Sequence, residues 1–344
     1  MKAAVVTENH QIITKEYPLP DIGKEEVLLK VLSCGVCGTD VGKVKFGLTT
    51  SPTVLGHEVA GEVVKKGDLV DRFQVGDRVV VAHHTPCYTC HYCRHENFSM
   101  CKVFKSSNLD PGGFAEYLRI PSAHVRLTAH KIPENLSYSQ AIFMEPLACV
   151  LRNIKRSKVV AGDTALVIGM GTMGLLTGQA LRAQGIKVIG SDLRQDRREL
   201  GQKLSFEATV SGEPSEVLNS VKKLTDQRGV DCVILTSGNE RVYSDSIAYV
   251  RDGGCISIFA GLAPGKRLDL DVNELYRREI ILFSSYSPSP LELIEALEYL
   301  AEGKVEVNIL APKIFNLDQL GEAINAAAAQ EVLKAIIEPH SVSL

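Results

Sequence analysis

The segment 164–174 reads TALVIGMGTMG, and it decides how the second half of this chain is expected to fold. Its first five residues are an apolar run with β-branched side chains, which is typical of a buried parallel strand. Three glycines follow at the spacing GxGxxG, and an apolar helical pattern then continues to Ala183. In such a strand–turn–helix unit, Gly169 permits the tight turn, Gly171 lets the backbone approach a pyrophosphate, and Gly174 allows close packing. The residues expected to contact a dinucleotide here are Gly169, Gly171, Thr172, Met173 and Gly174.

A second strand, 187–191, ends at an acidic residue that indicates which dinucleotide is bound. Asp192 lies 23 positions after Gly169, close to the ~20 expected for an acid that binds the adenosine ribose. It would accept hydrogen bonds from a free 2′-hydroxyl and repel a 2′-phosphate, so we expect NAD rather than NADP. Arg194, Arg197 and Arg198 point the other way, because an arginine can hold that phosphate. We favour a solvated helix start for this group and keep Arg197 as a candidate cofactor contact.

The α/β pattern continues with three more apolar runs, at 230–235, 254–259 and 279–283. In a doubly wound parallel sheet, ligands bind at the carboxyl ends of the strands. The residues just beyond these runs, Thr236, Ala260 and Ser285, are therefore predicted to lie in cofactor-binding loops.

The first part of the chain, up to about residue 150, has a different pattern. Short apolar runs at 3–6, 27–31, 59–64 and 77–82 are separated by Gly, Pro and Asp. Many short strands with such turn residues indicate a barrel-like or sandwich domain. A chain of 344 residues also suggests two domains.

Four closely spaced cysteines indicate a structural metal site. They follow the pattern Cys-x2-Cys-x2-Cys-x7-Cys. Four thiolates on one short loop can close around a zinc ion and leave no open position. The main alternative ligand for these four cysteines is an iron–sulfur cluster. Four histidines of this region are predicted to be surplus surface residues: His83, His84, His91 and His95. The predicted structural ligands are Cys87, Cys90, Cys93 and Cys101.

A second set of residues predicts a metal site with a free coordination position. Cys37 lies in the segment CGVCGTD at 34–40, and His57 and Glu58 follow in the segment LGHE at 55–58. A thiolate, an imidazole and a carboxylate form the ligand set of a catalytic zinc site, where the fourth position is left for water or substrate. These residues are expected in loops between strands, where a rigid scaffold usually presents chemistry.

Composition excludes several other functions. The chain is 45% hydrophobic and 23% charged, as globular proteins are, and its net charge of −3 gives no reason to expect nucleic acid or an anionic membrane as partner. We find no signal peptide and no apolar run long enough for a membrane span, so a cytoplasmic location is expected. Nine cysteines then favour metal ligation over disulfides.

Taken in order, several motifs resemble those of the zinc-dependent medium-chain dehydrogenases of the alcohol dehydrogenase superfamily, and they are similar to its sorbitol (polyol) and threonine dehydrogenase branches. The motifs are CGTD at 37–40, GHE at 56–58, the four cysteines, FMEPL at 143–147 and the glycine loop. The resemblance covers nearly the whole chain. It implies an α/β protein with a GroES-like β-rich catalytic domain and a Rossmann domain with a doubly wound parallel sheet. The implied boundaries are 1–152 with a zinc lobe at about 84–104, then 153–287 for the Rossmann domain, and 288–344 for the rest of the catalytic domain.

The resemblance also implies roles. Cys37, His57 and Glu58 match catalytic zinc ligands, and Glu145 matches an acid that either binds the metal or holds its water. Thr39 matches the hydroxyl that takes the substrate proton, and Asp40 a partner that orients the zinc-bound histidine. The implied cofactors are NAD and two zinc ions, one catalytic and one structural. The implied activity is oxidation of a secondary hydroxyl on a polyol or sugar-like alcohol, by a homo-oligomer that is a tetramer or dimer.

Two departures from the family keep alternatives open. Residues 41–43 read VGK where alcohol dehydrogenases often carry a histidine that ends a proton relay, and 284–288 read SSYSP where many sorbitol dehydrogenases carry a substrate-binding arginine. One alternative is a polyol-phosphate or amino-alcohol (threonine-type) dehydrogenase, because Lys43 near the zinc loop could meet an anionic group. Another class is a catalytically silent zinc- and nucleotide-binding regulator.

Overall fold

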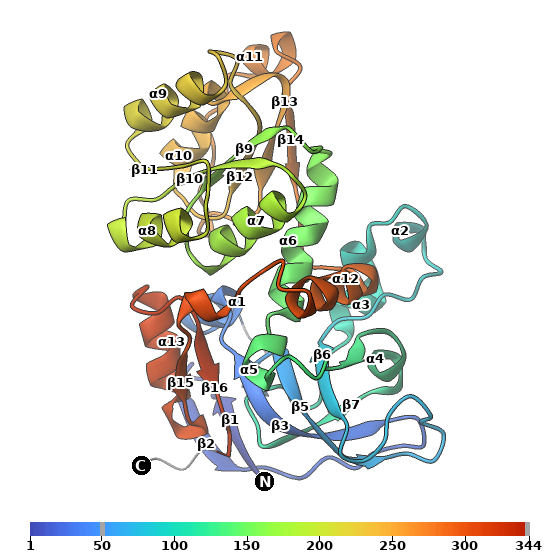
Figure 1. Ribbon diagram of the computed structural model, residues 1–344. Helices are drawn as coiled ribbons and strands as arrows, with labels where there is room; N and C mark the ends of the chain where they lie inside the picture. Colours follow the sequence, from blue (N-terminus) through green and yellow to red (C-terminus); the bar gives the residue numbers. More distant parts are fainter. Residues whose placement is uncertain (49–51, 341–344) are drawn as a thin grey trace. The chain divides into compact units, whose positions relative to one another are not determined.

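The structure, a computed structural model, describes residues 1–48 and 52–340 (Figure 1). It divides into two compact units. The first contains Met1–Ala148, Pro288–Glu302 and the C-terminal stretch from Leu310, and the second contains Cys149–Ser287 and Gly303–Ile309. The first unit is thus built from both ends of the chain, and the second from its middle.

These limits differ from the sequence-based boundaries in two places. The first junction falls between Ala148 and Cys149, inside helix α6 (Met144–Ser157), and not after residue 152. Residues 303–309 belong to the second unit, because the Gln179 side chain exchanges two hydrogen bonds with the backbone of Glu306, at 2.7 and 3.2 Å. Val305 and Val307 on either side are buried.

The first unit contains two sheets. A three-stranded sheet has the order β2-β1-β4, and a larger sheet has the order β15-β16-β3-β5-β6-β8, with β7 also paired to β3. The four apolar runs predicted as strands are β1, β3, β5 and β6. The strands of this unit are β1 (Lys2–Val6), β2 (Ile12–Glu16), β3 (Val27–Gly35), β4 (Thr53–Val54), β5 (Glu58–Lys66), β6 (Arg78–Ala82), β7 (Tyr117–Ile120), β8 (Ala129–Lys131), β15 (Lys313–Phe315) and β16 (Ala335–Ile337).

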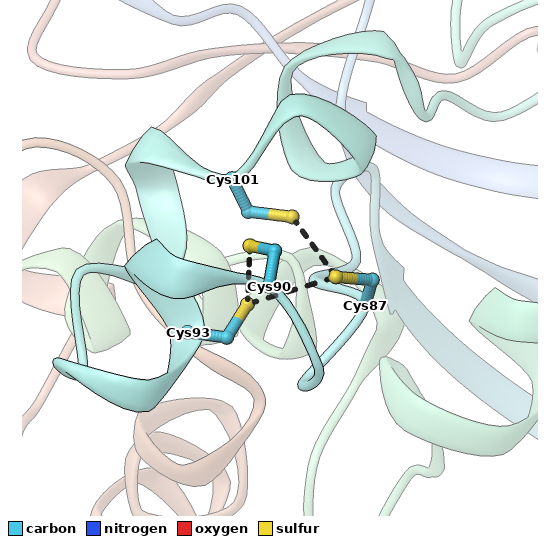
Figure 2. Close-up of side chains that lie close together, drawn as sticks. All are labelled: Cys87, Cys90, Cys93 and Cys101. Carbon is cyan, nitrogen blue, oxygen red and sulfur yellow. Dashed lines mark hydrogen bonds between the residues drawn. The ribbon is translucent and has the colours of Figure 1, made fainter.

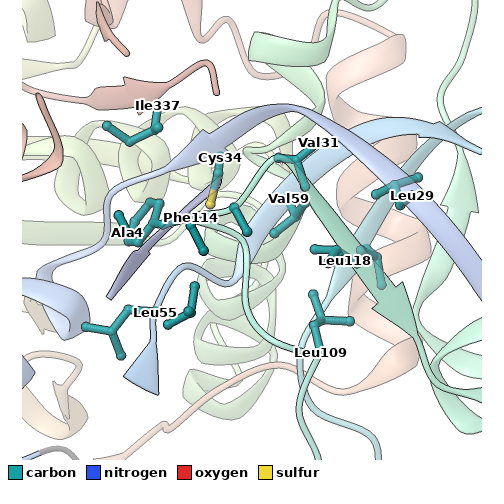
Figure 3. Close-up of a cluster of buried hydrophobic side chains, with 14 of the residues drawn as sticks. Ala4, Leu29, Val31, Cys34, Leu55, Val59, Leu109, Phe114, Leu118 and Ile337 are labelled. Atoms are coloured by element: carbon teal, nitrogen blue, oxygen red, sulfur yellow. The ribbon is translucent and has the colours of Figure 1, made fainter. Parts of the chain in front are cut away.

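The core of the first unit lies against β3 and β5. Leu29, Val59, Phe114 and Leu118 are fully buried there, and Figure 3 shows them packed with Cys34. Ile337 of β16 belongs to the same cluster, so the C-terminal segment helps to close this core. The helices of this unit are α1 (Gly38–Lys45), α2 (His91–Arg94), α3 (Lys102–Ser106), α4 (Ser122–Leu127), α5 (Tyr138–Ala141), α12 (Pro290–Ala301) and α13 (Leu320–Ala328).

The second unit is a parallel six-stranded sheet in the order β11-β10-β9-β12-β13-β14. Every neighbouring pair in it is parallel. Counted from β9, the first strand of this sheet, the order is that of the Rossmann fold, whose direction of winding changes between β9 and β12. The elements are β9 (Thr164–Ile168), α7 (Thr172–Ala183), β10 (Lys187–Ser191), α8 (Gln195–Lys203), β11 (Ala208–Val210), α9 (Pro214–Leu224), β12 (Val230–Leu235), α10 (Glu240–Asp245), β13 (Val250–Ile258), α11 (Val272–Arg277) and β14 (Ile281–Ser284).

The α/β fold class expected from the sequence, with a β-rich unit and a second unit built on a doubly wound parallel sheet, is confirmed. None of the helices within residues 1–48 and 52–340 combines the length and apolar character that crossing a membrane requires.

Candidate active site

The first candidate site lies where three strands of the large sheet begin or end. Gly35, the last residue of β3, is the register partner of Glu58 at the start of β5 and of Ile336 in β16. A Cβ built on Gly35 would collide with the Glu58 carboxylate and would come within 2.8 Å of Cε of Lys334. The missing side chain at position 35 therefore makes room for a buried acid at the start of β5 and a buried amine directly before β16.

Cys37 is fixed at this place by the start of helix α1. It is the N-cap residue, and its Sγ accepts a hydrogen bond from the backbone N–H of Thr39 at 3.5 Å. Asp40 completes a capping box, because its Oδ2 accepts from the backbone N–H of Cys37 at 3.1 Å. N–H groups at a helix start also stabilise a thiolate there.

Asp40 also joins the helix start to the loop before β5. It is almost fully buried, and its Oδ1 lies 3.4 Å from the backbone N of Gly56 and 3.5 Å from Nδ1 of His57. Burial by itself would lower the pKa of His57, but the Asp40 carboxylate outweighs it and holds that pKa well above its usual range. The contact expected between Asp40 and His57 is present, and it leaves Nε2 of the imidazole for another partner.

Glu58 has a partner that the sequence analysis missed. Its carboxylate forms a buried ion pair with the Lys334 ammonium, which also donates to the backbone carbonyl of Val36 at 3.1 Å. Burial disfavours the ammonium, but the Glu58 carboxylate and the Cys37 thiol group raise the pKa of Lys334. Lys334 and Glu58 are 276 positions apart. A lysine inside an apolar C-terminal run, with no obvious exposed face, was the only signal in the sequence.

The metal-binding atoms of Cys37, His57 and Glu58 all lie within 4.8 Å of one another. The donor set is one thiolate, one imidazole and one carboxylate, which fits an open zinc site. Glu145 lies buried in the first turn of α6 and is not part of this group. Thr39 is exposed in the first turn of α1, directly after Cys37 and Gly38.

The four cysteines of the predicted structural metal site surround a single position and leave no open side. Cys87, Cys90, Cys93 and Cys101 converge in Figure 2 with their sulfurs within 4.8 Å of one another. Sγ of Cys93 lies 3.6 Å from that of Cys90 and 4.0 Å from that of Cys87. A hydrogen bond from Thr89 is the main cause that lowers the pKa of Cys87 to about 6. Four converging thiols without an open position fit a structural zinc.

This lobe has very little core of its own. Its buried apolar cluster consists of Cys93, Cys101 and Phe104, with Cys87, Cys90 and Phe98 packed against it. So small a cluster cannot offset the entropy of ordering the loop, and small metal-binding lobes gain their folding free energy from the ion.

The glycine loop of the second unit has the geometry that dinucleotide binding needs. Gly169 adopts φ +91°, which favours glycine. A Cβ on Gly174 would collide with the carbonyl oxygen of Gly169, so helix α7 begins against the turn. A Cβ on Gly171 would meet no atom within 4 Å, which leaves the backbone open on the side where a pyrophosphate would approach.

Asp192 stands at the end of β10 and is held by backbone donors. Its Oδ2 accepts from the N–H of Met170 at 2.6 Å, and its Oδ1 from that of Arg194 at 2.9 Å. Arg194 is paired with Asp196 at 2.8 Å. Arg197 is buried, with its Nε 3.8 Å from the same carboxylate, so the expectation of a solvated arginine group is wrong for Arg197.

The three other predicted cofactor positions follow the carboxyl ends of neighbouring parallel strands. Thr236 directly follows β12 and donates to the carbonyls of Ile168 and Gly169, at 3.0 and 2.7 Å. Ala260 follows β13, and Ser285 follows β14 with its Oγ buried and without a partner among the described residues. A buried hydroxyl of this kind is expected to find a partner in a ligand or water.

Two of the four histidines predicted at the surface are not there. His83 and His84 are half-buried, and the His83 ring lies 4.6 Å from that of His57 and 3.7 Å from that of His84, centroid to centroid. Burial lowers the pKa of His84 to about 4 and that of His83 well below its usual range. The reason is that β6 ends at Ala82 beside Glu58 of β5, which brings the next residue against His57. His91 and His95 are exposed, as predicted.

Two family models match most of the chain. The alcohol dehydrogenase GroES-like domain matches residues 23–134, and the zinc-binding dehydrogenase matches residues 172–302. The chain is 31% identical to the sorbitol dehydrogenase of Bacillus subtilis, over 99% of this chain and 98% of that protein. It is also 31% identical to the D-arabitol-phosphate dehydrogenase of Enterococcus avium, over 94% of this chain and 92% of that protein. The fold is also similar to the crystal structure of a zinc-binding dehydrogenase from Sinorhizobium meliloti 1021 bound to NADP. The two superpose with a TM-score of 0.88 at 29% identity, over 98% of this chain and 99% of the other.

Proposed function

The chain belongs to the zinc-binding dehydrogenases that carry an alcohol dehydrogenase GroES-like domain, and from that membership we propose that it oxidises a secondary hydroxyl of a polyol or sugar-like alcohol to the ketone, with NAD as hydride acceptor. The first unit acts as the catalytic domain and the second as the dinucleotide-binding domain. The observation that carries the proposal is the convergence of Cys37, His57 and Glu58 with Asp40 behind the histidine.

Cys37, His57 and Glu58 would hold the catalytic zinc, and the four cysteines of the lobe a structural one. Zinc at an open site supplies Lewis-acid polarisation of an alcohol oxygen. Asp40 fixes the orientation of His57 by its contact with Nδ1. Glu145 either joins the ligand set or orients a water beside it.

Thr39 takes the hydroxyl proton of the substrate and passes it towards solvent. Its position supports this role, because it is exposed, yet its backbone is anchored to Sγ of Cys37. NAD, when bound, would supply the hydride acceptor for the carbinol carbon, and the alcohol would become the ketone as NAD becomes NADH. The dinucleotide is oriented by the glycine loop and by the loops at Thr236, Ala260 and Ser285.

The polar surroundings of the site support a hydroxyl-rich substrate. Carboxylate and imidazole side chains predominate around the candidate zinc site. The sequence has no tryptophan and only 6% aromatic residues, so few side chains could line an apolar channel for a simple alcohol. The named relatives act on polyols or a polyol phosphate, which supports the same class.

We also propose that NAD is preferred over NADP. The carboxylate of Asp192 is held at the end of β10, where it would accept from a 2′-hydroxyl and repel a 2′-phosphate. Asp192→Ala should relax the preference by about tenfold or more. If wild-type protein already reduces NADP faster than NAD, the arginines beside Asp192 are the discriminating residues instead.

The test is a screen of NAD reduction by zinc-loaded protein across polyols, cyclitols, polyol phosphates, threonine and simple alcohols. We expect turnover with at least one polyhydroxylated compound. Efficient oxidation of ethanol or butanol, with none of any polyol, would contradict the substrate class. No turnover with any alcohol would favour the silent zinc- and nucleotide-binding regulator.

Light scattering after gel filtration tests the further expectation of a homo-oligomer, a dimer or tetramer.

A further inference from the structure

One cavity of the first unit is lined by His57 and Asp40 of the candidate zinc site and by further groups that have no role in the reaction. It has a volume of about 180 Å³ and begins at His57 and Asp40, the inner end at the candidate zinc site. Its polar lining continues with Lys43, Thr53, His83 and Asn108, and the rest of its lining consists of Leu48, Val54, Leu55 and Gly56. A substrate whose reacting hydroxyl lies at the zinc ligands would extend its remaining atoms into this cavity.

Helix α1 directs Lys43 towards the same place as the reacting hydroxyl. Thr39 and Lys43 are four positions apart on α1, so they lie on one face of the helix, one turn apart. One turn is about 5.4 Å, a length that a chain of a few carbon atoms spans. The Lys43 side chain therefore starts one helical turn from Thr39 and lines the cavity into which the far end of a short polyol would reach.

Lys43 is half-buried and makes no ion pair or side-chain hydrogen bond among residues 1–48 and 52–340. The segment 49–51, TTS, contains no acid that could pair with it. The nearest acid in the cavity, Asp40, is already engaged by two backbone N–H groups and by His57. Lys43 thus keeps its ammonium donors free towards the cavity, although the Asp40 carboxylate lies within electrostatic range.

Two uncharged donors face the same space. Nδ1 of His83 is buried and has no hydrogen-bond partner within the described part of the chain. Asn108 uses its Oδ1 to accept from the N–H of Leu109, at 3.0 Å, which leaves the amide NH₂ group to donate. The buried, unpaired Nδ1 of His83 is expected to be satisfied by a ligand or water, and the amide of the exposed Asn108 can donate to the same ligand.

We propose that Lys43, His83 and Asn108 form an oxyanion subsite, and that the substrate is a polyol carrying a phosphate ester at the end remote from the reacting hydroxyl. This inference rests on the proposed dehydrogenase activity and narrows its substrate class. A lysine ammonium binds phosphate as a point charge, and a phosphate ester carries more negative charge for it to meet than a carboxylate does. The cavity lining contains no arginine among the described residues.

The decisive experiment compares matched substrates and matched variants. Initial rates of NAD reduction are measured with arabitol, galactitol, their terminal phosphate esters and the corresponding aldonates. Wild-type protein should have a kcat/KM at least tenfold higher for a phosphate ester than for its parent polyol. Lys43→Met should lower that ratio about 10- to 100-fold, as loss of a charged hydrogen bond does, and should do so mainly through KM.

Lys45→Met is the control, because Lys45 lies in the same last turn of α1 but is exposed, with its ammonium over the Phe46 ring. It should leave the ratio unchanged. Asn108→Ala should lower the ratio severalfold. Calorimetric titration with inorganic phosphate gives a readout that needs no turnover, and Lys43→Met should weaken that binding while Lys45→Met should not.

The outcomes separate the two proposals. If neutral polyols are oxidised as well as their phosphates and Lys43→Met changes neither the ratio nor phosphate binding, the subsite is refuted and the dehydrogenase stands. A preference for the aldonates overturns the assignment to phosphate. If no alcohol is oxidised, the proposed function fails, and loss of phosphate binding in Lys43→Met alone then decides whether the oxyanion subsite exists.

Discussion

The buried carboxylate of Glu58 has two possible cationic partners. One is the Lys334 ammonium, which is paired with it, and the other is a metal ion held with Cys37 and His57. A carboxylate has two oxygens and can serve both, but the share of each depends on the ligands present. Lys334 therefore holds the acid in place when the metal is lost.

Variants of the two acids separate a zinc ligand from a residue that positions water. Glu58→Gln should lower the zinc content at the open site, because the amide is a poorer ligand. Glu145→Gln should keep zinc and reduce turnover by about 10- to 100-fold, the penalty typical of changes around a metal site. Elemental analysis and initial rates on both variants check this. Loss of zinc in Glu145→Gln with retention in Glu58→Gln would reverse the two roles.

Removing the lysine should cost most when no metal is bound. Lys334→Met leaves the Glu58 carboxylate buried and unpaired, so in zinc-free protein the free energy of unfolding should fall by about 3–5 kcal/mol. With zinc bound the loss should be smaller, since the ion supplies the missing charge. Urea denaturation with and without chelator measures both values.

Lys131→Met is the matched control for this experiment. Its ammonium is paired with Asp77 at 2.8 Å, but it is 55% exposed, so its loss should cost under about 1 kcal/mol. A zinc-free Lys334→Met protein that loses no more stability than this control would show that Glu58 is compensated in another way.

Among the secondary-structure elements, the two helix starts at α1 and α7 carry most of the chemistry. Helix α1 presents Cys37 at its N-cap and Thr39 in its first turn. Helix α7 begins after a glycine N-cap whose backbone is open to a ligand. In both cases the backbone N–H groups of the first turn point to the place where negative charge is bound.

Two glycines of the second helix start should respond differently to the same substitution. Gly174→Ala should destabilise the second unit by about 1–3 kcal/mol, because the new methyl group meets the Gly169 carbonyl. Gly171→Ala should leave stability nearly unchanged, since nothing lies within 4 Å, but should weaken NADH binding. Thermal unfolding and fluorescence titration with NADH check the pair. Equal loss of stability in both would contradict the assignment of open space at Gly171.

In the molecule as a whole, the first unit contains two candidate metal sites that differ in design. The four cysteines of the lobe would close around an ion, whereas Cys37, His57 and Glu58 would leave a position open. A closed all-thiolate site releases zinc slowly, and an open site exchanges it with solvent ligands.

Brief chelation should therefore remove one zinc and abolish turnover, while a second zinc and the fold are retained. Longer chelation or Cys101→Ser should also release the second ion and make the lobe around residues 84–104 sensitive to limited proteolysis, because its cluster of Cys93, Cys101 and Phe104 is too small to hold it. Elemental analysis, far-UV circular dichroism and protease mapping follow the two steps. A single zinc in fully active protein would refute the two-site arrangement.

Much of this protein follows from short spacings in the sequence. The glycine loop, the strand before it and Asp192 after the next strand predict the Rossmann unit, because each lies within one supersecondary unit. The four cysteines predict their own cluster, since so short a loop brings them together wherever it lies. Cys37, His57 and Glu58 were found because residue types and spacing resemble those of a known family, and periodicity alone gave only strands on either side of them.

Only the tertiary structure decided which other residues contact the candidate zinc ligands. Lys334 reaches Glu58 because β16 returns to pair with β3, a contact across 276 positions that no local pattern encodes. The His83 ring lies against that of His57 because β6 ends beside β5, although the regular cysteine spacing made this histidine surplus as a ligand and led us to predict a surface residue. Local periodicity reports which face of a strand is buried, but strand order and register fix which ends of strands meet, and these are set by the packing of the whole core.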